Sequence, residues 1–272
     1  MGRHYKDERH SRSSRKSKSV KHVKKERKNI RSKSRDKRRN RIKSPNYSGV
    51  PMNNLKRINK SKRSYIHENF KATKINDEPY IVNMKNFLNN EEIKELIRLA
   101  EHRGFERSNM IIDGELQIND YRTSLTSYLL DDGMPYKYSK PIENLIKRIC
   151  YLCDCKRNQI EGLMMVKYEA SEEAYFWDHV DYFSEDKIYA VDNGGQRVIT
   201  IFSYLNTLSP EDEGETEFVE LDLKSRPQKG SAVFWWNIDE NGKMIPETKH
   251  RGNPVKNTSK IGLNIWVRQD GW

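Results

Sequence analysis

The first 63 residues carry a charge imbalance that no packed core can accommodate. They contain 25 lysines and arginines against 4 acidic residues, a net charge of +21, whereas the whole chain of 272 residues has a formal net charge of +12. Such a segment cannot bury enough apolar surface to offset the entropy lost when a chain is ordered. We therefore expect residues 1–77 to be a disordered basic tail and linker, and residues 78–272 to form one folded domain.

The remaining part of the chain has the composition of a soluble globular domain. Residues 64–272 have a net charge of −9, which is +12 less +21, and they hold all five tryptophans. No segment approaches the roughly 20 apolar residues of a membrane span, and the basic start lacks the apolar stretch of a secretory signal. The closely spaced Cys150, Cys153 and Cys155 indicate reduced thiols rather than a disulfide framework. We expect a cytoplasmic or nuclear protein, with a virus-infected host cell as one setting.

The dense positive charge of residues 1–63 also predicts a polyanionic partner. Its Arg/Lys-Ser repeats can neutralise phosphates without selecting a base sequence, and released counterions would make the binding steeply dependent on salt. RNA, DNA or an acidic protein fits this chemistry. A nuclear-targeting signal and a purely solubilising extension are the alternatives. The oligomeric state stays open.

The folded part is predicted to begin with a short strand at residues 80–84, to continue with two helices and to end as a β-rich half. Apolar residues recur at helical spacing from Ile93 to Ala100, after a capping Asn89 or Asn90, and again within residues 140–151. Short β-rich runs follow, joined by turns rich in Asn, Asp, Gly and Pro, at residues 162–168, 196–205, 217–221, 231–236 and 260–268. We predict a mainly β, α+β domain in which N-terminal helices pack on an antiparallel sandwich or barrel.

Two histidines and an aspartate are candidate metal ligands. Residues two apart on an extended segment point to the same side, so the side chains of His179 and Asp181 can meet one metal. His250 follows 71 residues later, just before a turn. Two imidazoles and one carboxylate leave adjacent positions open on a metal, as non-haem Fe(II) oxygenases require. A His-x-Asp pair that occurs by chance in a surface loop is the alternative.

Several motifs in a fixed order then resemble one family, the collagen-type prolyl 4-hydroxylases. These are 2-oxoglutarate- and Fe(II)-dependent dioxygenases of animals, plants, algae and some large viruses. The similar segments are residues 87–92, 121–124, 179–183, 194–205, 213–218, 229–235 and 250–255, with Lys260 ten residues after His250. The likeness covers about residues 79–270 and is closest in style to algal and large-DNA-virus members. It implies a double-stranded β-helix (jelly-roll) core with the helices packed on it.

The resemblance also implies roles for single residues. The positions that match the family's iron ligands are His179, Asp181 and His250. Those that match its 2-oxoglutarate site are Lys260, Tyr168 and Thr216. Those that match the surroundings of its peptide groove are Arg197 and Trp266. Lys260 begins a strand that continues with the apolar run 261–266. Its ammonium group would need an anionic partner there, unless the end of the side chain reaches solvent. Arg197 as an ion pair and Trp266 as a core residue are the structural alternatives. The loop from Tyr168 to His179 is about two residues longer than in the family, which leaves the role of Tyr168 open.

The activity implied by the resemblance is hydroxylation of peptidyl proline at C4 in collagen-like or proline-rich proteins. Fe(II), 2-oxoglutarate, dioxygen and L-ascorbate would be required, and succinate and carbon dioxide would be released. Asn253 stands where the family has a cysteine, which bears on the substrate groove. Two alternatives are a 2-oxoglutarate oxygenase acting on another protein side chain, and a nucleic-acid-binding protein that works mainly through its basic tail.

Overall fold

Fourteen strands and two α-helices make up the part of the chain that the computed structural model describes, residues 66, 68–112, 115–129, 139–183 and 194–271. The α-helices are α3 (Asn90–Arg103) and α4 (Lys140–Cys153). The strands are β1 (Thr73–Asn76), β2 (Ile81–Met84), β3 (Glu106–Arg107), β4 (Met110–Ile112), β5 (Glu115–Gln117), β6 (Leu125–Tyr128), β7 (Met164–Tyr168), β8 (Phe176–His179), β9 (Arg197–Tyr204), β10 (Thr216–Phe218), β11 (Leu223–Ser225), β12 (Ala232–Trp236), β13 (His250–Gly252) and β14 (Lys260–Arg268). Short 3₁₀ turns are η2 (Arg157–Gln159), η3 (Ala170–Glu172), η5 (Pro210–Asp212) and η6 (Pro246–Thr248).

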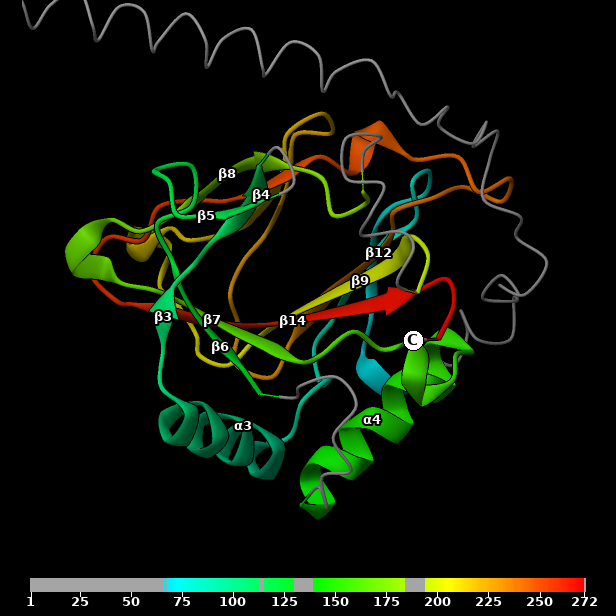
Figure 1. Cartoon of the computed structure of the whole chain (residues 1–272), viewed down its shortest axis with the longest axis horizontal. Helices are drawn as coiled ribbons and strands as arrows, with labels where there is room; N and C mark the ends of the chain where they lie inside the picture. Colours follow the sequence, from blue (N-terminus) through cyan, green and yellow to red (C-terminus); the bar gives the residue numbers. More distant parts are fainter. Residues whose placement is uncertain (1–65, 67, 113–114, 130–138, 184–193, 272) are drawn as a thin grey trace, which may run out of the picture. The chain divides into compact units, whose positions relative to one another are not determined.

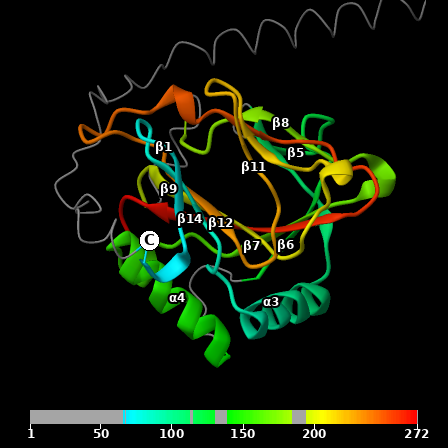
Figure 2. The same cartoon turned by 180° about the vertical axis from the view of Figure 1, so that it is seen from behind.

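The strands form two antiparallel sheets and a separate hairpin. The larger sheet has eight strands in the order β1-β2-β12-β9-β14-β7-β6-β3, and the smaller sheet has four in the order β11-β10-β13-β8. The hairpin pairs β4 with β5. Figures 1 and 2 show β8 on the opposite side of the large sheet from both helices. This mainly β architecture with few helices is consistent with the jelly-roll fold predicted above.

The larger sheet is buried on both faces. One core cluster joins its β9 and β14 to the apolar sides of the helices, for example Ile201 with Leu96 and Ile149. A second cluster lies on the other face, toward the smaller sheet, and contains Phe202 and Trp235. Burial on two faces explains why β9 and β14 read in the sequence as nearly continuous apolar runs.

Both predicted helices are present, and local chemistry fixes the start of the first. Asn89 and Glu92 form a capping box in which the amide N–H of Glu92 donates to Asn89 Oδ1 at 2.9 Å and the amide of Asn89 donates to Glu92 Oε2 at 3.0 Å. The face that includes Ile93, Leu96 and Ala100 is buried, as the periodicity predicts. The helix ends at Arg103, and the C-cap residue Gly104 has a φ of +83°.

Ordered structure reaches back before residue 78, where we placed the start of the domain. Ile66 and Phe70 are buried in the core, with the Phe70 ring centroid 6.1 Å from that of Phe87, and β1 pairs with β2. This could not be predicted from the sequence, because these apolar residues are isolated among polar ones and show no helical or strand periodicity. Residues 1–63 lie outside the described part of the chain, so the disorder of the basic tail stays a prediction.

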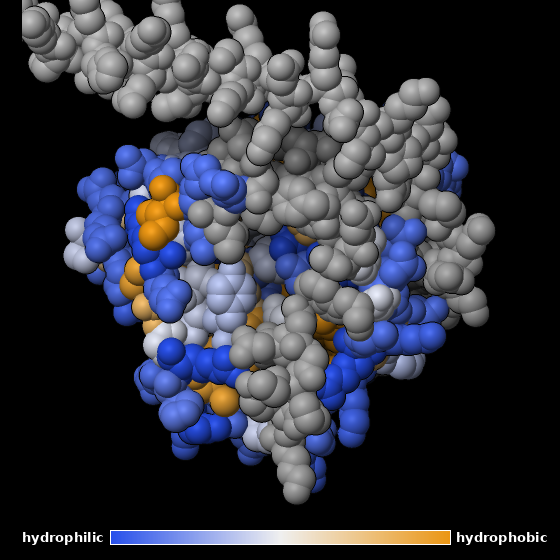
Figure 3. All heavy atoms as spheres, viewed as in Figure 1, coloured by the Kyte–Doolittle hydropathy of each residue, from blue (hydrophilic) through white to orange (hydrophobic). Residues whose placement is uncertain are grey.

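The described surface is mostly hydrophilic in the view of Figure 3, where apolar patches are small and separate. Within the described ranges, neither α-helix is long and apolar enough to cross a bilayer.

A buried ion pair joins the two helices and provides a test of how they are held. Arg148 of α4 donates to both carboxylate oxygens of Glu92, at 2.9 and 2.6 Å, and to the carbonyl of Phe87 at 2.7 Å. The Glu92 side chain is fully buried, so Arg148→Met would leave a buried carboxylate without its cation. We expect a loss of about 3 kcal/mol in the free energy of unfolding, measured by urea denaturation.

The matched control is Arg98→Met, because Arg98 pairs with Glu95 at the surface. We expect this variant to lose less than about 1 kcal/mol. Equal losses in the two variants would contradict the structural role of the buried pair.

Candidate functional site

A pocket between the two sheets brings together seven of the eight residues for which the sequence predicted a role. Its lining includes His179, Asp181, His250, Tyr168, Thr216, Lys260 and Trp266. The eighth, Arg197, is not among the lining residues. Because both sheets contribute side chains, the pocket exists only when the sheets are packed together.

The three candidate metal ligands converge, although they are up to 71 residues apart in the chain. His250 of β13 lies opposite His179 of β8 in the strand register, and Asp181 follows two residues after β8. His179 Nε2 is 4.0 Å from Asp181 Oδ1, and His250 Nε2 is 3.8 Å from Asp181 Oδ2. One ligand atom from each residue lies within 4.8 Å of the other two. These distances allow a single metal ion to be bound between the three side chains.

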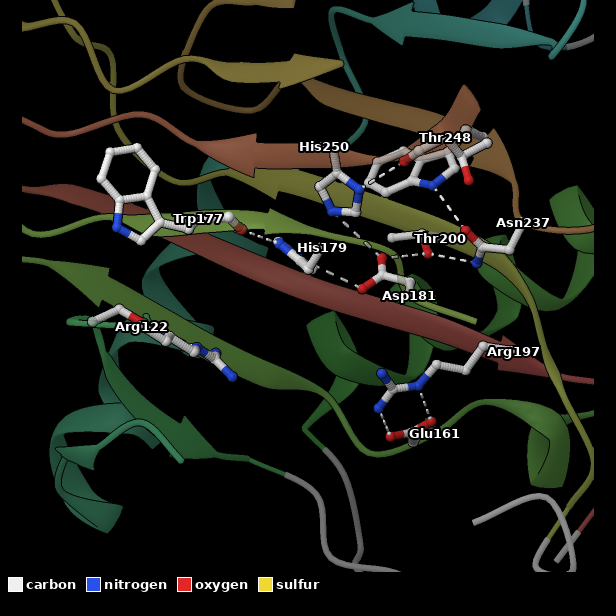
Figure 4. A network of polar contacts seen from close by, with 12 residues as sticks. Arg122, Glu161, Trp177, His179, Asp181, Arg197, Thr200, Asn237, Thr248 and His250 are labelled. Atoms are coloured by element: carbon white, nitrogen blue, oxygen red, sulfur yellow. Dashed lines mark hydrogen bonds and ion pairs between the residues drawn. The ribbon is translucent and has the colours of Figure 1, made fainter. Parts of the chain in front are cut away.

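Main-chain carbonyls set the orientation of both imidazoles (Figure 4). His179 Nδ1 lies 2.7 Å from the carbonyl oxygen of Trp177, and His250 Nδ1 lies 2.9 Å from that of Thr248. A carbonyl oxygen only accepts, so each Nδ1 must carry the hydrogen. Each Nε2 therefore has a free lone pair on the side that faces Asp181, which is the arrangement a metal-binding histidine needs.

The surroundings of the site shift the pKa of two of the candidate ligands, His179 and Asp181. Burial, assisted by the neighbouring His250, lowers the pKa of His179 well below its usual value. Burial alone would raise the pKa of Asp181, but interactions with His250, His179 and Arg197 and the hydrogen bond from Thr200 together outweigh it, so the net shift is downward. At neutral pH the site thus offers a neutral imidazole and a carboxylate. Two nitrogen donors and one oxygen donor suit Fe(II) and leave coordination positions open.

Lys260 is a buried cation at the same pocket. It is 0% exposed, its Nζ donates to the carbonyl of Gly214 at 2.8 Å, and within the described ranges no carboxylate forms an ion pair with it. Burial lowers its pKa to about 7, although Glu215 opposes the shift. Gly214 has a φ of +75°, and a side chain there would come within 2.7 Å of Leu208. A buried ammonium without a counterion fits a pocket that takes an anionic ligand.

Two hydroxyl groups line the pocket beside this ammonium. Tyr168 of β7 is paired with Lys260 in the strand register, and Nζ of Lys260 lies 4.2 Å from the centre of the tyrosine ring. The long loop after Tyr168 contains η3 and leaves this pairing intact. Thr216 of β10 is 4% exposed and accepts a hydrogen bond of 2.8 Å from the hydroxyl of Tyr204. Lys260, Tyr168 and Thr216 thus all line the same pocket.

Arg197 lies behind Trp266 instead of lining the pocket. Its guanidinium stacks 3.7 Å from the centre of the Trp266 ring and is hydrogen-bonded to both oxygens of Glu161. Glu161 also pairs with Arg268 at 3.2 Å. Trp266 itself lines the pocket, and its buried Nε1–H has no hydrogen-bond partner within the described part of the chain. Arg197 is therefore placed to support Trp266 from outside the pocket.

Arg122 is a pocket residue to which the sequence analysis gave no role. It is 8% exposed, and its guanidinium donates to the hydroxyls of Ser124 at 3.2 Å and Thr126 at 3.4 Å and lies 4.8 Å from the centre of the Phe176 ring. No carboxylate of the described residues forms an ion pair with it, and burial lowers its pKa.. The sequence held only a partial signal, the similarity of residues 121–124 to the family, because the surrounding segment is too short to show a period.

Comparisons with known proteins find similar sequences among the 2-oxoglutarate/Fe(II) oxygenases. The sequence model described as the 2OG-Fe(II) oxygenase superfamily matches residues 163–268. Human prolyl 4-hydroxylase subunit alpha-3 is 28% identical over 199 residues, 71% of this chain and 34% of that protein. Probable prolyl 4-hydroxylase 10 of Arabidopsis thaliana is 29% identical over 204 residues, 67% of this chain and 66% of that protein. This chain thus spans about a third of the human subunit and slightly less than two thirds of the plant protein.

A solved structure extends the similarity to the fold. The viral collagen prolyl hydroxylase of Paramecium bursaria Chlorella virus-1, in its 2OG complex, aligns with a TM-score of 0.53 and 25% identity. The alignment covers 69% of this chain and 95% of the viral protein.

The unpaired charge of Arg122 leads to a prediction about stability. A buried cation without a counterion costs free energy, so an apolar side chain of similar length should be tolerated. We expect Arg122→Met to have an unfolding free energy within about 1 kcal/mol of the wild type, or above it, in urea denaturation. A loss as large as that expected for Arg148→Met would show that Arg122 serves the fold and not the pocket.

Proposed function

We propose that this protein is a prolyl 4-hydroxylase acting on peptidyl proline in collagen-like or proline-rich polypeptides, since the sequence model of the 2OG-Fe(II) oxygenase superfamily matches residues 163–268. The observation that carries the proposal is the joint presence, in one pocket, of the His179–Asp181–His250 cluster and the unpaired ammonium of Lys260. The names of the similar proteins, all prolyl hydroxylases, support proline as the substrate residue.

The donor groups of the pocket divide into two sets. His179, Asp181 and His250 would hold Fe(II), while Lys260, with Tyr168 and Thr216 beside it, would bind the distal carboxylate of 2-oxoglutarate. When bound, iron would supply the oxidising chemistry that converts proline, 2-oxoglutarate and dioxygen to hydroxyproline, succinate and carbon dioxide, with ascorbate as the family's reductant. The protein's contribution is to orient these groups and to exclude water from the apolar space between the sheets.

Two further donors would position the peptide. The buried guanidinium of Arg122 and the free Nε1–H of Trp266 both lie at the pocket, and peptide carbonyl oxygens are the acceptors that a substrate offers them. Arg197 would act through Trp266, because it stacks on the outer side of that ring. Phe176 stacks on the His179 ring with their centroids 3.5 Å apart and adds an aromatic wall next to the metal site.

The basic tail is assigned a separate partner. The excess of 25 lysines and arginines over 4 acids in residues 1–63 favours an RNA, DNA or acidic protein partner bound through counterion release. This interaction would recruit the enzyme and take no part in its chemistry.

The decisive experiment measures succinate formation by the full-length chain with Fe(II), 2-oxoglutarate and ascorbate, with and without a Pro-Pro-Gly repeat peptide. We expect peptide-stimulated succinate, a proline product heavier by one oxygen atom, and no turnover in His179→Ala. Turnover without proline modification would favour the alternative of another protein side chain. No turnover under any condition, together with binding of RNA or DNA, would favour the alternative that the tail is the functional part.

The lowered pKa of Lys260 predicts a pH dependence for 2-oxoglutarate binding. Below about pH 7 the ammonium is already formed in the ligand-free protein, whereas above it binding must take up a proton. The affinity should therefore fall as the pH rises, by up to about tenfold per pH unit. Calorimetry of the Mn(II)-loaded chain at pH 6.5 and 8.5, in buffers of different ionisation enthalpy, measures both the affinity and the proton uptake.

Lys260→Arg is the matched control for this titration. A guanidinium stays charged throughout this range, so the variant should bind 2-oxoglutarate with an affinity that does not change between the two pH values. Wild-type binding that is independent of pH and takes up no proton would contradict the assignment of Lys260.

A further inference from the structure

We propose that Thr200, Asn237 and Trp235 form a one-way chain of hydrogen bonds, here called the Asp181 relay, that holds the Asp181 carboxylate oriented for metal binding before the metal arrives. The inference rests on the proposed metal centre and assigns positioning roles to three residues that do not ligate the metal.

The relay is continuous and buried (Figure 4). Trp235 Nε1–H donates to Asn237 Oδ1 at 2.9 Å, Asn237 Nδ2–H donates to Thr200 Oγ1 at 2.9 Å, and the Thr200 hydroxyl donates to Asp181 Oδ2 at 2.8 Å. Thr200 and Asn237 are 0% exposed and Trp235 is 1% exposed. Water therefore does not compete for these groups, and each hydrogen bond is stronger than it would be at the surface.

The chemistry of the first donor fixes the direction of the whole relay. An indole nitrogen only donates, so the oxygen of the Asn237 amide must face Trp235 and its NH₂ must face Thr200. Thr200 Oγ1 accepts that hydrogen bond, which leaves its own single proton for Asp181. The last group in the relay must then accept, and Oδ2 of Asp181 does so. The relay thus fixes which oxygen of Asp181 faces Thr200 and leaves Oδ1 for the metal site.

The relay also links the two sheets at the metal centre. Thr200 lies on β9 and Trp235 on β12, where they are paired in the register of the larger sheet. Asp181 follows β8, the edge strand of the smaller sheet. Through Thr200, the rigid interior of the larger sheet therefore sets the position of a ligand that belongs to the other sheet.

Asp181 differs from the other two ligands in the kind of support that it receives. The imidazoles of His179 and His250 are oriented by main-chain carbonyls, whereas Asp181 is oriented by a side-chain hydroxyl. Thr200 bonds Oδ2, and no hydrogen bond from the described residues reaches Oδ1, which stays available to the metal. The support of Asp181 can therefore be removed by substitution without touching a ligand.

The test is Co(II) binding by the full-length chain, followed by calorimetry and by the visible absorption of the bound metal. Thr200→Val removes the hydroxyl but keeps the shape of the side chain, and we expect it to weaken Co(II) binding by about 10- to 100-fold. Thr200→Ser keeps the hydroxyl and should restore the affinity to within about threefold of the wild type.

A second variant tests the direction of the relay. Asn237→Asp at pH 8 replaces the donor amide with an acceptor of the same shape, so the Thr200 proton is drawn toward position 237 and away from Asp181. We expect weaker Co(II) binding and an altered visible spectrum, as for Thr200→Val. The matched control is Ser203→Ala, which removes a buried hydroxyl of the same strand that bonds the carbonyl of Ser231 at 2.9 Å. This control should bind Co(II) as the wild type does.

The outcomes separate the relay from the metal centre. If Thr200→Val and Asn237→Asp both bind Co(II) as tightly as the wild type, the relay is overturned but the metal centre is not. The same conclusion follows if Ser203→Ala loses as much Co(II) affinity as these two variants. A wild-type chain that binds no Co(II), or a His179→Ala variant that binds it equally well, would overturn the metal centre and the relay with it. The melting temperature of each variant, measured with a chelator present, shows whether the metal-free variant is still folded. A variant that loses Co(II) affinity only because it is unfolded would also count against the relay.

Discussion

The free-energy cost of burying charge between two apolar sheets is the constraint on which this structure depends. Most buried charges are paired within the protein: Glu92 with Arg148 between the helices, and Glu161 with Arg197 and Arg268 behind the pocket. Lys260 and Arg122 are the exceptions among the residues described above, because each is buried at the pocket without a carboxylate partner. Such charges are costly in the empty protein and are stabilised when an anionic or carbonyl-bearing ligand binds. The unpaired cations therefore mark the side of the molecule where ligands act.

The two sheets contribute differently to the site. The smaller sheet supplies the histidines, from edge strand β8 and its neighbour β13, while the larger sheet supplies Lys260, Tyr168 and the Asp181 relay from buried central strands. Central strands are held on both sides by ladder hydrogen bonds and by packing on both faces, so they position side chains more rigidly than edge strands do. Asp181, which follows a strand of the smaller sheet, is in this way oriented by Thr200 of the more rigid larger sheet.

The sequence was informative where structure is local or repetitive. The long buried strands β9 and β14 and the helices α3 and α4 follow from apolar patterns that a single segment contains. The short strands β3, β8 and β13 contain two to four residues, which is too few to show an alternation. Ile66 and Phe70 gave no signal for the same reason, since their burial depends on partners such as Phe87 that come later in the chain.

For the site, the residue types and spacing of His179, Asp181 and His250 indicated a metal centre, and the resemblance to the prolyl 4-hydroxylases supplied the co-substrate role expected of Lys260. Those roles are carried by residue types that few other side chains can replace. Only the tertiary structure decided that Arg197 lies behind Trp266, that Arg122 enters the pocket without a counterion, and that Thr200 donates to Asp181. These features depend on which faces of distant strands meet, and the free energy of burying a polar group is set by its neighbours in space and not by its neighbours in the chain.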